Sequence, residues 1–230
     1  MSDSYYELVD ATDELGEKFV ATDLARSTWS ATIQHAAPVS ALLVRGLERC
    51  ERRDDTRLSR VMVDLLGPVP AEGDLWVRTQ RERSGKQIEL LTAEMLAPGP
   101  DGGPRPVARA SGWRLQMLDT AEVVHAPAPP LRPVAEAKSR DMKKDWDRNY
   151  VHSLDWRWLT KPLSDGAGES WIRPEVDLVK GETMTPLERL FAVADDANGI
   201  GTTIGTLFDE RGAIGGIQQS VLVRPRPPKR

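Results

Sequence analysis

Two adjacent carboxylates stand where a predicted helix ends, and carboxylates can accept protons or polarise water. The segment TPLERLFAVADDANG predicts a helix near residues 185–198, because Thr185 and Glu188 form a capping box ahead of an apolar stripe. Asp195 and Asp196 fall in its last turn, where the helix dipole is negative and each carboxylate costs up to about 1 kcal/mol. A local rule that is broken without visible compensation indicates a functional site.

A carboxamide beside such a carboxylate would help to hold a water molecule, and the C-terminal segment supplies one. Gln218 and Gln219 lie in the middle of a predicted strand, where the two-residue period turns one side chain inward. Successive helical residues lie about 100° apart around the axis, so only one of Asp195 and Asp196 should face a site. The simpler interpretations are a solvated helix end and a glutamine that only satisfies backbone groups.

An internal repeat helps to choose between the two aspartates. Residues 38–50, PVSALLVRGLERC, predict a second helix with Pro at its start. When the two prolines are superposed, Leu47 falls on Asp195 and Glu48 falls on Asp196 without a gap. Because Leu47 is a core position and Glu48 is charged, the repeat favours Asp195 as the inward side chain.

Candidate strands surround both helices. Trp29 and Trp171 mark a strand candidate ahead of each helix, and the C-terminal run from Gly201 repeats the last hairpin of the first copy. Four further segments follow the first helix, alternate or run apolar, and are separated by Gly and Pro. They predict an antiparallel meander and read RLSRVMVDLLGPVP, GDLWVRTQRERSG, KQIELLTAEMLAP and VARASGWRLQML.

The chain therefore divides into two copies of one α+β unit. We predict an N-terminal unit at residues 1–119, a Pro/Ala-rich and then charged linker at 120–149, and a C-terminal unit at 150–230. We expect the helices near 38–52 and 185–198, each wrapped by antiparallel strands. Joining the two sheets edge to edge would hide a vulnerable strand edge.

The second copy is shorter than the first. Two predicted strands separate the first helix from the strand at Gln87, whereas the matching strand of the second copy begins near Thr203, almost directly after its helix. Loss of interior strands would expose the helix stripe at about 25 cal/mol per Å². We therefore expect the C-terminal unit to lack internal strands near 198–204, because the sequence joins two segments across an absent stretch. A true deletion would instead favour a decayed unit that binds without catalysing.

Composition excludes several classes of protein. The 230 residues are 40% hydrophobic and 29% charged, with a formal net charge of -4, so no broad basic footprint for nucleic acid is present. The single cysteine, Cys50, allows no internal disulfide, and three scattered histidines give no zinc cluster. No apolar run is long enough to span a membrane. We expect a cytoplasmic homo-oligomer, dimeric or higher, without a metal or other cofactor.

The order and spacing of these segments resemble a known family. RLSRVMVDLLGPVP, TPLERLFAVADDANG and GGIQQSVLVRP look like the corresponding segments of type II acyl-CoA thioesterases. The resemblance implies an α+β double hotdog, with two helices each wrapped by a long antiparallel sheet, that hydrolyses acyl-CoA to free fatty acid and CoA. The chain departs from the family at residues 35–38, where His-Ala-Ala-Pro replaces a glycine-rich entry to the first helix. This difference argues against an oxyanion site in the first half.

The family resemblance also implies site residues. An Asp, a Thr and a Gln act together in type II thioesterases, and gapless alignment puts the Asp on Asp196 and the Gln on Gln219. Relatives with an Asp-x-x-Asn-Gly ending point instead to Asp195, and the Thr would fall in the absent stretch. We predict that one aspartate and Gln219 position the attacking water, while a backbone N–H near a helix start or a glycine stabilises the oxyanion.

Two other functions stay open from the sequence. One is a non-catalytic acyl-CoA or acyl-lipid binding protein. The other is a hotdog dehydratase or hydratase, for which Asp147 and His152 have a suitable spacing but precede a predicted strand and not the central helix. His35, at the mouth of the first helix, could approach an acyl group or simply cap the helix.

Overall fold

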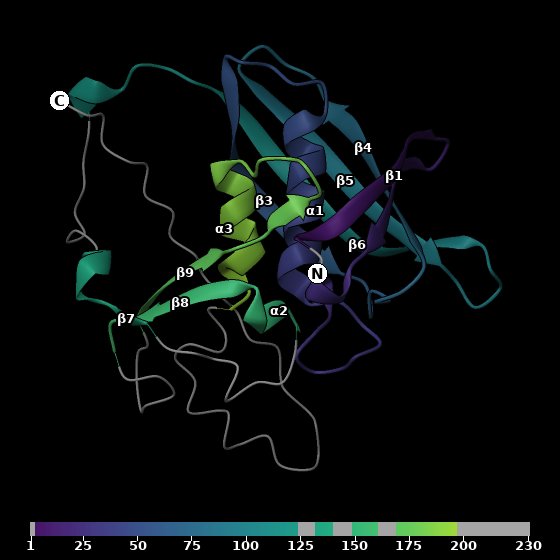
Figure 1. Cartoon of the computed structure of the whole chain (residues 1–230). Coiled ribbons are helices and arrows are strands. Elements are labelled where there is room, and N and C mark those ends of the chain that lie inside the picture. Colours follow the sequence, from purple (N-terminus) through teal and green to yellow (C-terminus); the bar gives the residue numbers. More distant parts are fainter. Residues whose placement is uncertain (1–2, 124–131, 140–148, 161–168, 197–230) are drawn as a thin grey trace.

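A curled seven-stranded sheet around a central helix dominates the computed structural model, which describes residues 3–123, 132–139, 149–160 and 169–196 (Figure 1). The strand order is β10-β1-β2-β4-β5-β6-β3, and a smaller sheet has the order β7-β8-β9. The strands of the large sheet are β1 (Ser4–Asp13), β2 (Gly16–Ala21), β3 (Thr56–Leu65), β4 (Asp74–Arg83), β5 (Ile88–Pro98), β6 (Pro104–Gln116) and β10 (Asp177–Val179). The small sheet contains β7 (Lys138–Ser139), β8 (Leu154–Trp158) and β9 (Ser170–Pro174).

The helices include the two that the sequence predicted. They are α1 (Ala36–Arg49), α2 (Asn149–His152) and α3 (Pro186–Ala194), with short 3₁₀ turns η1 (Asp23–Ala25), η2 (Ala121–Val123) and η3 (Val134–Glu136). The predicted capping box of α3 is confirmed, because Thr185 Oγ1 accepts from Glu188 N at 3.1 Å and Glu188 Oε2 accepts from Thr185 N at 2.9 Å.

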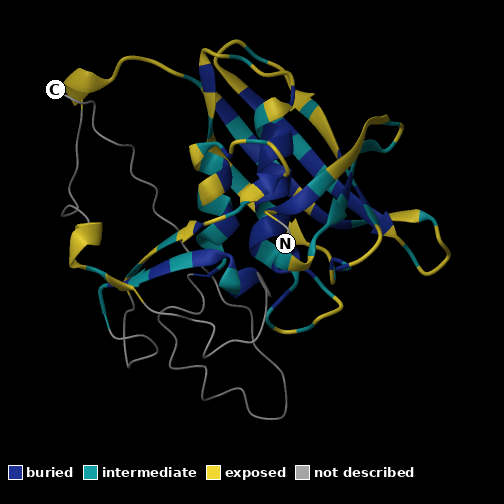
Figure 2. Cartoon of the chain, viewed as in Figure 1, coloured by how far each residue is buried: buried dark blue, intermediate teal, exposed yellow. Residues whose placement is uncertain are grey.

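Helix α1 is buried on almost every side, as Figure 2 shows. Leu42, Leu43 and Leu47 are fully buried in the hydrophobic core. Gly46 permits this close fit, because a Cβ at that position would lie 3.0 Å from Thr79 Cγ2 of β4. The sequence pattern of α1 is therefore that of a helix inside a curled sheet and not of a helix on a surface.

A buried cation lies on the same helix. Arg45 Nη1 donates to Glu17 Oε2 at 2.7 Å, and Arg45 Nε donates to Glu182 Oε2 at 2.8 Å. Two carboxylates satisfy the guanidinium, which makes its burial tolerable. The network fastens α1 to β2 and to the segment that leads into α3.

The predicted meander holds for β4, β5 and β6 but is wrong for β3. Strand β3 pairs with β6 at the far edge of the sheet and not with β4, which follows it in sequence. Residues 66–73 between β3 and β4 are too long for a tight hairpin and include two prolines. This loop passes the start of α1, where Gln34 N donates to Val69 O at 2.8 Å.

The sequence did not predict the N-terminal hairpin, and it placed one tryptophan wrongly in a strand. Strands β1 and β2 were not predicted, because β1 buries its first residues on both faces and then becomes exposed, without a regular alternation. Trp171 lies on β9 as expected, whereas Trp29 lies in an exposed loop outside any strand.

Helix α3 lies antiparallel against α1, since contacts join opposite ends of the two helices. Thr185 at the start of α3 donates its hydroxyl to Glu48 Oε2 near the end of α1 at 2.6 Å. Asp195 at the end of α3 lies beside His35 at the start of α1. One hydrophobic core contains side chains from both predicted units, including Leu42 and Tyr150.

The junction between the two units differs from the predicted antiparallel sheet. Strand β9 ends at Pro174, which has no N–H to continue the ladder. The chain bends at 175–176, and β10 then runs parallel to β1, with Ser4 opposite Asp177. Within the described residues the units are therefore joined by a parallel strand pair, and β7–β9 form a sheet of their own. The prediction of one joined antiparallel sheet is wrong here.

Two predictions stay untested. The step near 198–204, where we expect absent strands, lies outside the described residues. The proposed unit boundaries and the linker at 120–149 likewise stay predictions.

Candidate active site

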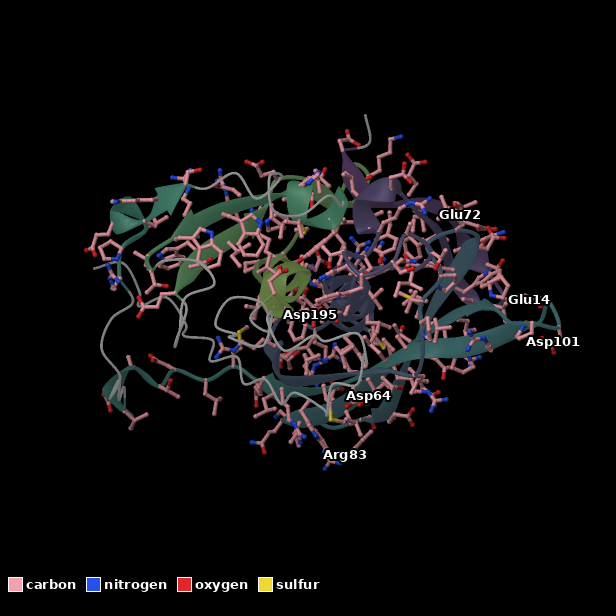
Figure 3. All side chains as sticks on the ribbon, turned by 90° about the horizontal axis from the view of Figure 1, so that it is seen from below. Glu14, Asp64, Glu72, Arg83, Asp101 and Asp195 are labelled. Atoms are coloured by element: carbon pink, nitrogen blue, oxygen red, sulfur yellow. The ribbon has the colours of Figure 1, made fainter. Side chains whose placement is uncertain are left out.

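The end of α3 lies against the start of α1, and this contact brings the predicted aspartates to a helix N-terminus. Asp195 caps α3, and its Oδ2 lies 3.6 Å from Nδ1 of His35, the residue that caps the start of α1 (Figure 3). The positive end of the α1 dipole therefore lies beside Asp195. It supplies the compensation that the sequence of α3 alone did not show.

His35 is a neutral cap. Its Nδ1 accepts from Ala37 N at 3.3 Å, and its ring stacks on Tyr150 with centroids 3.9 Å apart and planes inclined by 15°. Burial lowers the pKa of His35 to about 4, so the imidazole is neutral at pH 7. With Nδ1 as an acceptor, the proton of the neutral ring sits on Nε2. The 3.6 Å approach of Asp195 is therefore neither an ion pair nor a hydrogen bond at neutral pH.

Asp196 is buried against Tyr150. The Tyr150 hydroxyl lies 2.6 Å from Asp196 Oδ2 and 2.7 Å from Ala192 O. Burial raises the pKa of Asp196 to about 8; the contact with Tyr150 opposes this rise, and the charge of Asp195 adds to it. The pKa of Tyr150 is also raised by burial.

One hydroxyl proton cannot serve both acceptors of Tyr150. If Asp196 is protonated, it can donate to Tyr150 Oη while Tyr150 donates to Ala192 O, which gives each group a partner. The raised pKa of Asp196 and the local geometry therefore agree on a neutral carboxyl at pH 7. Asp196 holds its proton in a buried hydrogen-bond chain.

Asp195 has a different environment. Its side chain is 40% exposed, and burial raises the pKa of its carboxyl. The repeat favoured Asp195 as the inward side chain. The structure shows the opposite order of burial, since Asp196 is the more buried of the two. Helix α3 ends at Ala194, so Asp195 is its C-cap and Asp196 lies beyond the helix that the comparison with α1 assumed.

Tyrosines from distant segments support the site. Tyr5 of β1 donates to Ser153 Oγ at 2.7 Å, since the Ser153 hydroxyl is itself donated to Tyr150 O at 2.6 Å. The rings of Tyr5 and Tyr150 lie 6.0 Å apart. Sequence reasoning missed both tyrosines, because no periodic pattern links the N-terminus to the segment before β8.

The start of α1 leaves one backbone donor without a partner among the described residues. Its first N–H groups cannot bond within the helix. His35 N donates to Ala25 O at 2.8 Å, Ala37 N donates to the His35 ring, and Pro38 has no N–H. Ala36 N–H is the one that is left, at the helix end that the aspartates approach.

Other predicted residues are not brought to this place. Gln219 and Asp147 lie outside the described residues. In the described ranges no group of three or more His, Cys, Asp or Glu is arranged to bind a metal, and no helix there is long and apolar enough to cross a bilayer.

Solved structures with a similar architecture identify the fold. A hotdog protein of unknown function from Alicyclobacillus acidocaldarius is 13% identical with a TM-score of 0.57, and the match covers 77% of this chain and 63% of that one, just under two thirds. A protein described as a candidate thioesterase II from Thermobifida fusca is 13% identical with a TM-score of 0.58, over 89% and 73% of the two chains. The predicted α+β hotdog fold is confirmed.

A third structure and a family model refine this result. A candidate thioesterase from Novosphingobium aromaticivorans is 16% identical with a TM-score of 0.56, over 83% of this chain and 71% of that one. Residues 25–115 match the model of the acyl-CoA thioesterase N-terminal domain, so the predicted resemblance is confirmed over α1 and β3–β6. Asp195 and Asp196 lie outside this match. No curated protein matches the chain.

Proposed function

We propose that the protein is an acyl-CoA thioesterase in which Asp195 positions and deprotonates the attacking water. The observation that carries this proposal is the position of Asp195 beside the capped start of α1. The match of residues 25–115 to an acyl-CoA thioesterase domain supports the substrate class. The products are a free fatty acid and CoA.

Asp195 suits the role of base better than Asp196. A general base must be ionised and must reach water, and Asp195 is partly exposed, whereas Asp196 is buried with a pKa of about 8. Asp196, Tyr150 and His35 act as positioning residues. They form the packed wall that fixes the end of α3 against α1.

The oxyanion needs a preorganised donor, and Ala36 N–H is the candidate. It belongs to the helix end where the dipole is positive, and its neighbours at the helix start are already bonded. The glycine-poor entry His-Ala-Ala-Pro does not prevent this role, because the donor is a backbone group. Gln219 is our predicted partner of Asp195 in holding the water.

Release of free CoA from a panel of acyl-CoAs, followed with a thiol-detecting reagent, tests the proposal. We expect turnover with at least one chain length. Glu48→Gln is the matched control, since Glu48 is a partly buried carboxylate at the opposite end of the helix pair and should not affect turnover. Saturable acyl-CoA binding without CoA release would favour the non-catalytic binding protein. The predicted homo-oligomer stays a prediction.

A further inference from the structure

A concave surface with a volume of about 600 Å³ lies on the outer face of β8 and β9. Along β8 the side chains of Leu154, Trp156 and Trp158 are buried, so the residues between them point to the other face. On that face Asp155 stands opposite Arg173, and Arg157 stands opposite Trp171. These four side chains therefore line one concavity, separated by the small sheet from the buried tryptophans.

The carboxylate of Asp155 orients the side chains of Arg157 and Arg173. Asp155 Oδ2 accepts from Arg157 Nε at 3.0 Å and from Arg173 Nε at 3.1 Å. The terminal amino groups of both guanidinium forks make no hydrogen bond to another described residue. One carboxylate, with a side chain only 13% exposed, thus orients two positive charges and leaves an excess of positive charge. Such forks match the geometry of phosphate oxygens.

An aromatic ring completes the surface. Trp171 is 36% exposed, and its Nε1 donates to Arg132 O at 3.1 Å, which fixes the orientation of the indole. Arg132 also lines the concavity, with its own charge directed to Glu136 and Glu169 at 3.4 and 3.2 Å. An exposed, oriented indole is a surface on which a nucleobase can stack.

We propose that this surface binds a purine nucleotide, with its phosphate groups on Arg157 and Arg173 and its base on Trp171. The combination favours a nucleotide over a simple anion, because an isolated phosphate would use the guanidinium forks and leave the indole exposed. The volume also falls in the range of small-molecule sites. The ligand is either a free nucleotide or the nucleotide end of a larger molecule such as CoA.

Isothermal titration of the full chain with ADP tests the site. We expect saturable binding to the parent protein and an affinity weaker by about tenfold or more in R157Q/R173Q, because two charge-assisted contacts are lost. R78Q/R109Q is the matched control, since Arg78 and Arg109 also pair with one carboxylate, that of Glu94, but lie outside the concavity. This control should bind ADP as the parent does.

Three results would overturn the proposal. They are no saturable binding at ADP concentrations up to about 5 mM, equal loss of affinity in the control variant, and binding of inorganic phosphate as tight as that of ADP. R173Q alone keeps the Arg157–Asp155 pair and guards against a folding defect in the double variant. It should weaken ADP binding by a smaller factor.

Two further titrations identify the source of the nucleotide. Tighter binding of CoA than of ADP, with the same fold loss in R157Q/R173Q, would assign the site to the nucleotide end of CoA. Binding of ADP that CoA does not displace would assign it to a free nucleotide. Pantetheine should not bind here, and its binding with the same sensitivity to R157Q/R173Q would contradict the proposal. No thioester is involved, so these results are independent of the proposed hydrolysis.

Discussion

Asp196 and His35 are both buried with shifted pKa values, so the free energy of unfolding should depend on pH in an unusual way. The pKa of Asp196 is raised to about 8, so between about pH 4 and 8 the folded chain binds a proton that the unfolded chain has lost. Stability should therefore fall as pH rises through this window, by about 1.4 kcal/mol for each pH unit. The whole contribution is about 5.5 kcal/mol.

His35 acts in the opposite direction over part of the same range. Its pKa is lowered from 6.5 to about 4, so between these values the unfolded chain binds a proton that the folded chain lacks. Stability should rise with pH there, by about 3 kcal/mol in all. Between pH 4 and 6.5 the contributions of Asp196 and His35 to the free energy of unfolding cancel. Between pH 6.5 and 8 only the contribution of Asp196 remains, and the chain loses about 2 kcal/mol of stability.

Urea unfolding at a series of pH values measures these contributions. Asp196→Asn removes the carboxyl whose ionisation lowers the free energy of unfolding as pH rises. This variant should therefore gain stability relative to the parent by about 2 kcal/mol between pH 6.5 and 8. His35→Asn replaces the capping ring nitrogen by an amide oxygen and removes the histidine titration, so the stability of this variant should fall steadily from pH 4 to 8. Parallel curves for Asp196→Asn and the parent above pH 6.5 would refute the assignment of a buried neutral carboxyl.

Three further predictions follow from the packing. Tyr150→Phe should lower the free energy of unfolding by about 1–3 kcal/mol in urea, since Asp196 and Ala192 O lose their shared partner; an unchanged midpoint would contradict the hydrogen-bond chain. Gly46→Ala should lower Tm despite a better helix propensity, because its Cβ meets Thr79 Cγ2 at 3.0 Å and Val77 Cγ1 at 3.2 Å, and Thr79→Ser should restore part of the lost Tm. Arg45→Met should destabilise the chain by about 1–3 kcal/mol, because Glu17 loses its partner and Glu182 keeps only the more exposed Arg49. A Tm shift no larger than that of the exposed-pair variant Lys180→Met would count against this last account.

Local sequence rules predicted the elements that depend on neighbouring residues. The capping box located the start of α3, and alternation located β5 and β6. Position in the sheet was less predictable, since β3 pairs with β6 across the helix and not with the strand that follows it. Burial of Arg45 could not be predicted, because a charge is tolerated inside only when distant carboxylates reach it.

The candidate site was predicted only in part, because local rules identify some of its residues and contacts between distant residues form the rest. Asp195 and Asp196 were found because they conflict with the dipole of their own helix, a local rule. The compensation for Asp195 comes from α1, and the partner of Asp196 is Tyr150, 46 residues away in sequence. Contacts at that separation depend on the fold and leave no mark in a local pattern.

The most direct test of the account compares Asp195→Asn and Asp196→Asn in acyl-CoA hydrolysis at pH 7, with thermal unfolding to confirm that both variants fold. Asp195 is our base, so Asp195→Asn should lower kcat by about 100-fold or more. Asp196 is already neutral, and asparagine can keep a contact with Tyr150, so Asp196→Asn should stay within a few-fold of the parent. Full activity in Asp195→Asn together with a large loss in Asp196→Asn would contradict the account.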